Sequence, residues 1–196
     1  MHKTAQQLAD AAAAAMQARD RASQALGMKL LEVGPGSASM QMAVREDMGN
    51  VHKTAQQLAD AAAAALYPRD HASHSLGIKL LKVGPGTARM QMTVREDMAN
   101  VHNTCHGGLI YTLADSTFAY ACNSHNRNAV AVTCIIEYMR PAYVGDVLTS
   151  SGSEQGLEGR NGVYDIRVEN QKGELVALFR GKSTQIKGEV TELGKH

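Results

Sequence analysis

The hydrophobic pattern is strongest in the middle of the chain, where apolar residues follow a helical spacing over residues 109–122. They cover nearly the whole circumference of the predicted helix, which is typical of a buried helix. The helix is expected to begin at the glycine pair Gly107 and Gly108, after the polar residues 100–104. Asp115 lies in its middle. Because burying an unpaired carboxylate is costly, Asp115 must be paired, protonated or functional.

An internal repeat occupies the first half of the chain. Residues 1–50 recur as residues 51–100 with roughly three quarters of positions identical. Only two copies are present, so the pattern does not predict a solenoid. The similar segments GNVHKT and ANVHNT at the two junctions indicate that the opening segment was copied once. We therefore predict that residues 51–196 form a complete domain and that residues 1–50 are an additional N-terminal copy.

Each copy has the pattern of a helix followed by a β-hairpin. Alanine-rich sequence favours the helix, and Gly-Pro-Gly favours the hairpin turn. Alternating apolar residues predict a half-buried second strand. In the second copy we expect a helix over 54–66 that Pro68 ends, a short helix over 71–76 between Asp70 and Gly77, and strands over 78–83 and 87–94.

β-rich segments follow the buried helix. Together with the hairpin before that helix they predict an α+β fold, in which a sheet wraps around one apolar helix. The expected strands are 129–138, 147–153, 163–169 and 175–186, with a glycine-rich loop over 156–162, a turn over 171–173 and a loose polar tail over 187–196.

Composition and charge narrow the functional class. The chain has 196 residues, 44% of them hydrophobic, and a net charge of +1, so charge indicates neither nucleic acid nor an acidic membrane surface as a partner. No apolar run is long enough to span a membrane, and the N-terminus lacks the apolar core of a secretory signal. Three cysteines without a framework spacing are typical of reduced thiols, so we expect a cytoplasmic protein.

Three segments together carry a family resemblance. Residues 102–124 (HNTCHGGLIYTLADSTFAYACNS), 130–148 (VAVTCIIEYMRPAYVGDVL) and 162–183 (GVYDIRVENQKGELVALFRGKS) resemble the hotdog-fold acyl-CoA thioesterases of the phenylacetic acid degradation (PaaI) type. The resemblance covers about residues 65–187. It implies a hotdog fold and hydrolysis of an aryl- or phenylacetyl-type CoA thioester to the free acid and CoA. It implies no metal or bound cofactor, and a homodimer that commonly pairs into a homotetramer.

The chemistry of the central helix fits such a reaction. Backbone N–H groups at a helix start are unpaired and lie at the positive end of the helix dipole, so Gly107 suits polarising a thioester carbonyl. Asp115 either attacks that carbonyl or activates a water molecule, and the sequence leaves both routes open. Eight residues separate the two, which is ~12 Å along one helix. A single helix cannot bring both to one carbonyl, so we predict that Gly107 of one subunit faces Asp115 of another.

Further site residues follow from the resemblance. Asn100 and His106 match the pair that positions or polarises the thioester, and Thr133 falls where relatives place a hydroxyl near the attacking water. Arg69 stands where some relatives carry a substrate-side asparagine. The remaining predicted substrate-binding residues are Gly108 beside the oxyanion site and, toward the CoA phosphates, Arg140, Arg180 and Lys182.

Structural roles compete with several of these assignments. His106 can be a helix-cap residue, Thr133 an ordinary strand residue, and the basic residues solvated strand ends. His102, Cys105 and His106 form an HxxCH segment, but without a further ligand pair it does not predict a metal site. No base is oriented toward Cys105, which argues against a cysteine nucleophile. Tyrosines and phenylalanines that can line an acyl pocket are Tyr111, Phe118, Tyr120, Tyr138 and Tyr143.

Two other functions remain open at this point. One is a non-catalytic acyl-CoA-binding hotdog module, which needs the CoA groove but not the acid, so that the presence of Asp115 argues against it. The other is a hotdog enoyl-CoA hydratase or dehydratase. That chemistry requires a histidine–carboxylate pair at the α and β carbons, whereas His106 precedes the helix.

Overall fold

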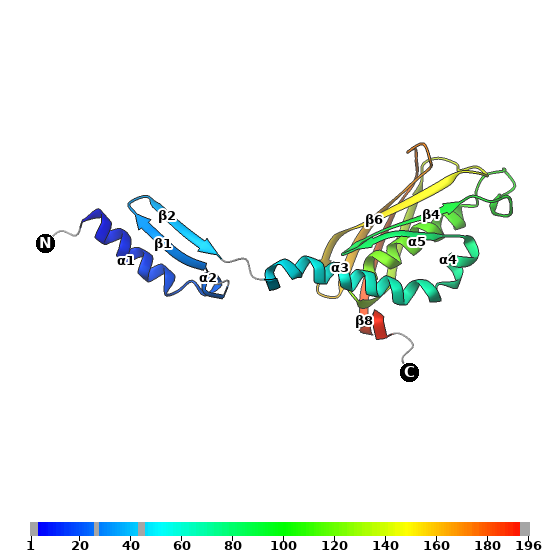
Figure 1. Ribbon diagram of the computed structural model, residues 1–196. Helices are drawn as coiled ribbons and strands as arrows, with labels where there is room; N and C mark the ends of the chain where they lie inside the picture. Colours follow the sequence, from blue (N-terminus) through cyan, green and yellow to red (C-terminus); the bar gives the residue numbers. More distant parts are fainter. Residues whose placement is uncertain (1–3, 26–27, 43–45, 193–196) are drawn as a thin grey trace. The chain divides into compact units, whose positions relative to one another are not determined.

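The computed structural model describes residues 4–25, 28–42 and 46–192. The chain divides into two compact units, residues 1–51 (unit 1) and residues 52–196 (unit 2) (Figure 1). Each unit has its own helices and strands, and each is described by itself. Whether residues 51–196 fold without the preceding copy stays a prediction.

Unit 1 consists of helices and a two-stranded antiparallel sheet. Its first helix begins with a capping box. The Thr4 hydroxyl accepts the Gln7 N–H, and the Gln7 side chain accepts the Thr4 N–H. The helix and hairpin expected for the first copy are both present. The elements are α1 (Ala5–Gln17), α2 (Arg21–Ala25), β1 (Met28–Gly34) and β2 (Ser37–Met42).

Unit 2 repeats this helix and hairpin and then adds one long helix and four more strands. This is the order that the sequence predicts. Its elements are α3 (Glu46–Leu66, of which residues 52–66 belong to this unit), α4 (His71–Leu76), β3 (Lys79–Gly84), β4 (Thr87–Thr93), α5 (Gly107–Asn123), β5 (Arg127–Tyr138), β6 (Val147–Glu158), β7 (Asn161–Glu169) and β8 (Leu175–Glu189), with 3-10 turns η1 (Tyr67–Arg69), η2 (Glu96–Met98) and η3 (Val190–Glu192).

The ends of α4 are set by the residues that the sequence indicates. Asp70 accepts the Ser73 N–H at 3.1 Å and caps the N-terminus. Gly77 ends the helix with a left-handed φ of 68°, a conformation that costs glycine little. These two local signals bring the chain out of α3 and into β3.

All six strands of unit 2 form one antiparallel sheet in the order β3-β4-β6-β7-β8-β5. α5 contacts each of these strands and lies on one face of the sheet (Figure 1). The predicted α+β arrangement is therefore confirmed. Alternate residues of β4, among them Met90 and Met92, are fully buried against the α5 residues Leu113 and Phe118.

The predicted glycine-rich loop over residues 156–162 is wrong. β6 continues to Glu158 and β7 begins at Asn161, so the connection between them is only two residues long. Gly162 pairs with Leu157 inside the sheet. A Cβ at Gly162 would lie 2.7 Å from the Tyr164 ring, so this glycine allows close packing within a strand and does not mark a turn.

The predicted loose tail is also wrong for residues 187–192. β8 continues to Glu189, and Val190 is buried. Asn126 holds this end of the chain, because its side chain donates to the Glu189 carboxylate at 2.8 Å and accepts the Thr191 N–H at 3.0 Å. A distant asparagine therefore orders a segment that looks loose in the sequence alone. Residues 193–196 lie outside the described part of the chain.

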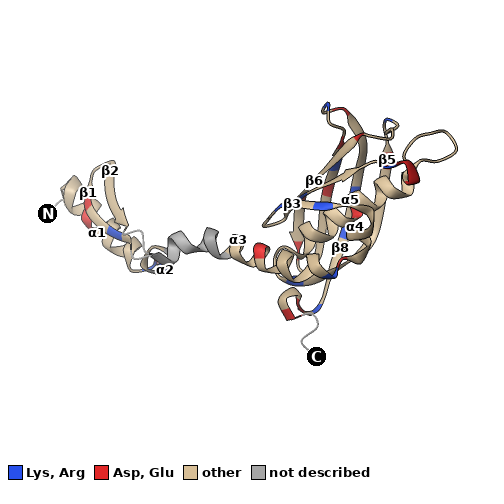
Figure 2. Ribbon diagram, turned by 45° about the vertical axis from the view of Figure 1, so that its right-hand side comes forward, with Lys and Arg blue, Asp and Glu red and all other residues tan. Residues whose placement is uncertain are grey.

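Charged residues of both signs are interspersed along the strands of unit 2 (Figure 2). Several lie close enough to pair, such as Arg167 with Glu169 at 3.0 Å and Arg140 with Glu174 at 2.9 Å. Positive and negative residues are almost equal in number, which gives the chain a net charge of +1.

Gly181 should be intolerant of any side chain. A Cβ there would lie 2.8 Å from the ring of Phe118, which is buried and cannot move aside. Gly181→Ala is expected to lower the free energy of unfolding of unit 2 by about 1–3 kcal/mol in urea denaturation. Gly156→Ala is the matched control, because that strand position has open space around it. Equal losses in the two variants would contradict this account of the packing.

A shortened chain of residues 51–196 is expected to fold. The buried hydrophobic cluster that holds unit 2 together contains only residues between 59 and 179, and α1 of unit 1 has no buried residue. Circular dichroism should show mixed helix and strand content and a cooperative thermal transition. Loss of that transition in the shortened chain would rule the prediction out.

Candidate active site

The start of α5 leaves one backbone donor available. His106 is the N-cap residue, and its Nδ1 accepts the Gly108 N–H at 3.2 Å. The N–H groups of Leu109 and Ile110 donate to the His106 carbonyl. Within the described part of the chain, the Gly107 N–H makes no hydrogen bond to the backbone or to a side chain. This donor therefore lies at the positive end of the α5 dipole and can bind an anionic oxygen.

Tyr138, at the end of β5, fixes the position of this donor. Its hydroxyl donates to the Gly107 carbonyl at 2.8 Å. A Cβ at residue 107 would lie 3.2 Å from the Tyr138 ring, so glycine permits the close approach. Beside them is an open hollow of about 280 Å³. It is lined by Thr104, Cys105, Gly107, Ile110 and residues 138–141.

Asp115 lies in the middle of α5 and is half-buried. The Cys134 thiol of β5 donates to Asp115 Oδ1 at 3.9 Å. Burial raises the pKa of Asp115, and the hydrogen bond from Cys134 partly offsets that rise. Tyr111 is part of the same group, since burial and these neighbours raise its pKa to about 12. A half-buried carboxylate with a raised pKa is suited to accept a proton from water or to attack a carbonyl.

Gly107 and Asp115 are both in α5 and eight residues apart. Their separation is ~12 Å along the helix axis, because each residue adds about 1.5 Å. Two groups that act on one carbonyl must each lie within roughly 3 Å of it. One α5 helix therefore does not bring these two groups to the same reacting centre.

Asn100 organises the loop before α5. Its Oδ1 accepts the N–H groups of His102 and Thr104, at 2.8 and 3.3 Å, and the Thr104 hydroxyl at 3.2 Å. The side-chain oxygen is thus used to hold the loop that leads to His106. The amide NH₂ of Asn100 is the group that can donate to a substrate.

The other predicted residues lie apart from Asp115. In the β5–β8 register, Thr133 lies opposite Lys182, and Ile135, two residues on, lies opposite Arg180. All four side chains are exposed. Cys134, between the two β5 residues, points to the α5 side, so Thr133 lies on the opposite face of the sheet. Arg180 makes a two-pronged ion pair with Asp165 at 2.6 Å. Arg140 lines the hollow beside Gly107 and pairs with Glu174, while Arg69 is exposed at the end of η1.

The sequence does not indicate Cys134 as a site residue, because period-2 alternation does not tell which face of an edge strand meets the helix. Tyr138 lines the hollow, in agreement with its expected place in a pocket. Its hydrogen bond to Gly107 does not follow from the sequence, because it depends on where β5 ends relative to α5. Of the other aromatic candidates, Phe118 and Tyr120 are core residues.

The HxxCH segment does not gather into a site. Cys105 is buried, and burial raises its pKa to about 11, which leaves it a thiol at neutral pH. Across the described ranges, no group of three or more His, Cys, Asp or Glu side chains is arranged to hold a metal ion. In the same ranges, no helix has the length and apolar character needed to cross a membrane.

Comparisons with known proteins agree with this geometry. The sequence pattern of the thioesterase superfamily matches residues 102–177. The acyl-coenzyme A thioesterase PaaI of Escherichia coli (strain K12) is 49% identical over 88 residues, which are 45% of this chain and 63% of that protein. A relative from Archaeoglobus fulgidus is 42% identical over 77 residues, which are 39% of this chain and 50% of the relative. The aligned stretch thus spans less than two thirds of each of these curated relatives.

Solved structures match over almost their whole length. The E. coli PaaI protein from the phenylacetic acid degradation operon is 43% identical, with a TM-score of 0.67, over 68% of this chain and 97% of that chain. A point mutant of the phenylacetic acid degradation protein PaaI from Thermus thermophilus is 38% identical, with a TM-score of 0.58, over 60% of this chain and 100% of that chain. Unit 2 therefore has the hotdog fold, and the chain belongs to the thioesterase superfamily as a relative of the PaaI acyl-CoA thioesterases.

Proposed function

We propose that the protein hydrolyses acyl-CoA thioesters to the free acid and CoA. The observation that carries the proposal is the half-buried Asp115 with a raised pKa, in the same helix that begins with an available N–H at Gly107. The first group can serve as base or nucleophile, and the second can bind the developing oxyanion. The match to the PaaI acyl-CoA thioesterase supports the choice of substrate class.

Two routes are compatible with this arrangement. In the first, the Asp115 carboxylate takes a proton from water, the hydroxide attacks the thioester carbon, and the C–S bond breaks to release CoA thiolate, which then takes up a proton. In the second, the carboxylate attacks the carbon itself, forms an anhydride with release of CoA thiolate, and water hydrolyses the anhydride. In both routes the Gly107 N–H stabilises negative charge on the carbonyl oxygen.

The active form is proposed to be a homodimer, with two dimers pairing into a homotetramer. Since Gly107 and Asp115 of one α5 are ~12 Å apart, one chain supplies the N–H and its neighbour the carboxylate. The exposed face and edge of β5 support such pairing. β5 is the last strand of the sheet, and Val132 and Ile135 are 55% and 56% exposed. A strand at a sheet edge has unpaired backbone groups, which can pair with another chain.

The acyl group is proposed to be of aryl or phenylacetyl type. The names of the E. coli and T. thermophilus relatives, which refer to phenylacetic acid degradation, support this class. The hollow beside Gly107 has an aromatic wall in Tyr138, which can pack on an acyl ring. The reaction needs no metal or bound cofactor in this proposal, because Asp115 and Gly107 supply the base and the oxyanion donor.

The CoA phosphates are proposed to meet basic side chains near this hollow. Arg140 is the best placed of them, since it lines the hollow beside Gly107, although it also pairs with Glu174. Lys182 and Arg69 are exposed and can reach a ligand in a dimer, while Arg180 is already held by Asp165.

The remaining predicted residues take supporting parts in this proposal. His106, Asn100 and Gly108 hold the loop and the helix start. Thr133 lies on the sheet face away from its own α5 and is proposed to serve the site of a neighbouring subunit. A cytoplasmic location is supported by three free cysteines.

Asp115→Asn should abolish most turnover. The amide cannot accept the proton or attack the carbonyl, so kcat/KM for phenylacetyl-CoA should fall by about 10²–10⁴-fold in a thiol-release assay. The melting temperature should stay equal or rise, because the variant no longer buries a charge. Glu158→Gln, at an exposed carboxylate, is the control and should keep full activity. Unchanged hydrolysis in Asp115→Asn would remove Asp115 from the mechanism.

The pH dependence of kcat/KM should show the effect of the Cys134 thiol on the pKa of Asp115. The Cys134 hydrogen bond favours the ionised carboxylate and lowers its pKa. Cys134→Ala removes this donor, so the pKa of Asp115 should rise and the acid limb of the profile should move to higher pH. Cys134→Ser keeps a donor and should stay nearer the wild type. An acid limb that does not move, or moves to lower pH, would contradict the assignment.

A further inference from the structure

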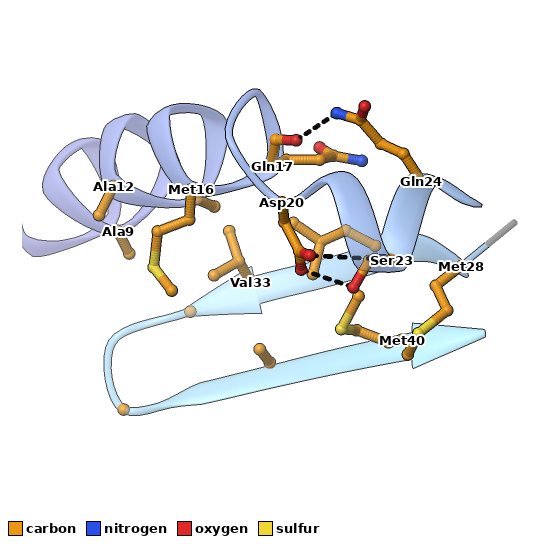
Figure 3. A pocket seen from close by; sticks show the side chains of 15 residues that line it. Ala9, Ala12, Met16, Gln17, Asp20, Ser23, Gln24, Met28, Val33 and Met40 are labelled. Carbon is orange, nitrogen blue, oxygen red and sulfur yellow. Dashed lines mark hydrogen bonds between the residues drawn. The ribbon is translucent and has the colours of Figure 1, made fainter. Parts of the chain in front are cut away.

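Unit 1 carries an open apolar groove between α1 and its hairpin, with a volume of about 400 Å³ (Figure 3). Ala9, Ala12 and Met16 line it from α1, and Val33 and Met40 from the hairpin. Met16 is 73% exposed and Met40 is 48% exposed. An apolar groove that faces water and is rimmed by polar residues is a candidate surface for a partner.

Unit 2 shows what covers the same surface in the second copy. Among the residues fifty positions later, Ala59, Ala62 and Met90 are at most 1% exposed, Val83 is 8% exposed and Leu66 is half-buried. Ala59 and Met90 belong to one buried cluster with Leu113 and Phe118 of α5. In unit 2 this surface is therefore covered chiefly by α5, which packs mainly on its β4 strand.

The two copies have the same local geometry. Leu30 pairs with Met40 in unit 1 as Leu80 pairs with Met90 in unit 2, and the register shifts directly after that pair in both hairpins. The helix is tied to the hairpin in the same way. Gln6 donates to the Val33 carbonyl at 2.7 Å, and Gln56 to the Val83 carbonyl at 3.0 Å. Unit 1 thus presents a surface already shaped for an α5 helix.

α5 also makes polar contacts that the first copy can reproduce. In unit 2, the Tyr120 hydroxyl donates to Asp70 at 3.2 Å, and the Ser116 hydroxyl lies 3.1 Å from that of Ser73. Ser124 Oγ accepts the Gly86 N–H at 2.7 Å. The corresponding residues of the first copy, Asp20, Ser23 and Gly36, are of the same types and line the groove. There Asp20 accepts the Ser23 N–H at 3.0 Å and the Ser23 hydroxyl at 2.5 Å, so binding of α5 would exchange the second of these hydrogen bonds for the contacts seen in unit 2.

The strand beside the groove fits the same partner. β4 pairs with β6 along its length, from Thr87 with Ser153 to Thr93 with Val147. β2 is the equivalent strand of unit 1, and all of its residues are exposed. In the described two-stranded sheet its outer edge has no strand beside it. An unpaired edge of this kind can add a strand from another chain.

We propose that unit 1 binds the α5–β6 face of a second copy of this chain, in place of that copy's own residues 54–92. The exchange creates no new type of contact, because each contact has a counterpart in unit 2, and exchange of identical elements is a low-cost route to association. The same exchange within one chain is the competing outcome, and crosslinking between two chains that each carry one introduced cysteine separates the two. The inference does not depend on the proposed thioesterase activity.

The second copy fits its own α5 better than the first copy does, which explains the described arrangement. Tyr67 packs on Tyr120 with ring centroids 6.4 Å apart, whereas the first copy has Gln17 at that position. Ile78, buried in unit 2, is replaced by Met28. The exchanged form is thus the minor one at equilibrium, and its detection calls for a covalent trap.

Cysteine trapping between two full-length variants tests the exchange. In unit 2, Gln91 pairs with Thr149, and their side chains touch at 3.4 Å. Gln41 is the first-copy equivalent of Gln91. One chain carrying Gln41→Cys is mixed with another carrying Thr149→Cys and oxidised mildly. The expected product is a disulfide between residues 41 and 149 of different chains, seen on a non-reducing gel and confirmed by peptide mass.

Two controls make the result specific. Ser153→Cys replaces Thr149→Cys in the first, since it lies four residues on, roughly 13 Å along the strand, beyond the reach of a disulfide from residue 41. Met40→Asp, added to the Gln41→Cys chain, places a charge in the groove and should remove the product. The native cysteines are present in every mixture. The proposal would be overturned if the 41–149 product were absent or if Ser153→Cys gave an equal yield. A third variant carries both Gln41→Cys and Thr149→Cys in one chain, and a link that formed only within that chain would also overturn the proposal.

Discussion

Burial of α5 against one face of a six-stranded sheet is the constraint on which unit 2 depends. Every strand of this sheet contacts the helix. At several strand positions a glycine, which has no Cβ, allows the helix to approach closely. Gly181 faces Phe118, and Gly152 faces Thr117, in each case with too little room for a Cβ to fit without a shift. The β3–β4 hairpin packs on the helix at one end of the sheet, and β5 packs on it at the other end. The helix is therefore held in one position, and so are the groups at its start and middle.

That fixed position is what gives the candidate site its chemistry. At the start of α5, His106 and Tyr138 use the neighbouring backbone groups and leave the Gly107 N–H available. In its middle, the same burial that stabilises the helix raises the pKa of Asp115. A carboxyl group whose pKa is raised by burial is a candidate functional residue, because such shifts are common at active sites.

The sequence predicts the fold of unit 2 well, because its signals are local. Apolar periodicity marks α5, and Asp70 with Gly77 marks both ends of α4. The errors come from long-range contacts: Gly162 looks like a loop residue until its packing on Tyr164 is known. The same holds for the site. Asp115 and Gly107 stand out by type and spacing, whereas Cys134 and Tyr138 become site residues only through the placement of β5 beside α5.

The copied helix and hairpin have a consequence in simple arithmetic. Each chain has two helix–hairpin copies that can cover an α5–β6 face, residues 4–42 and 54–92, but it has only one such face. In an assembly of any size, there is therefore one more helix–hairpin copy per chain than there are α5–β6 faces to bind. If unit 1 exchanges as proposed, the exchange can link chains head to tail in an open series or a ring, and it leaves one helix–hairpin face per chain without an α5.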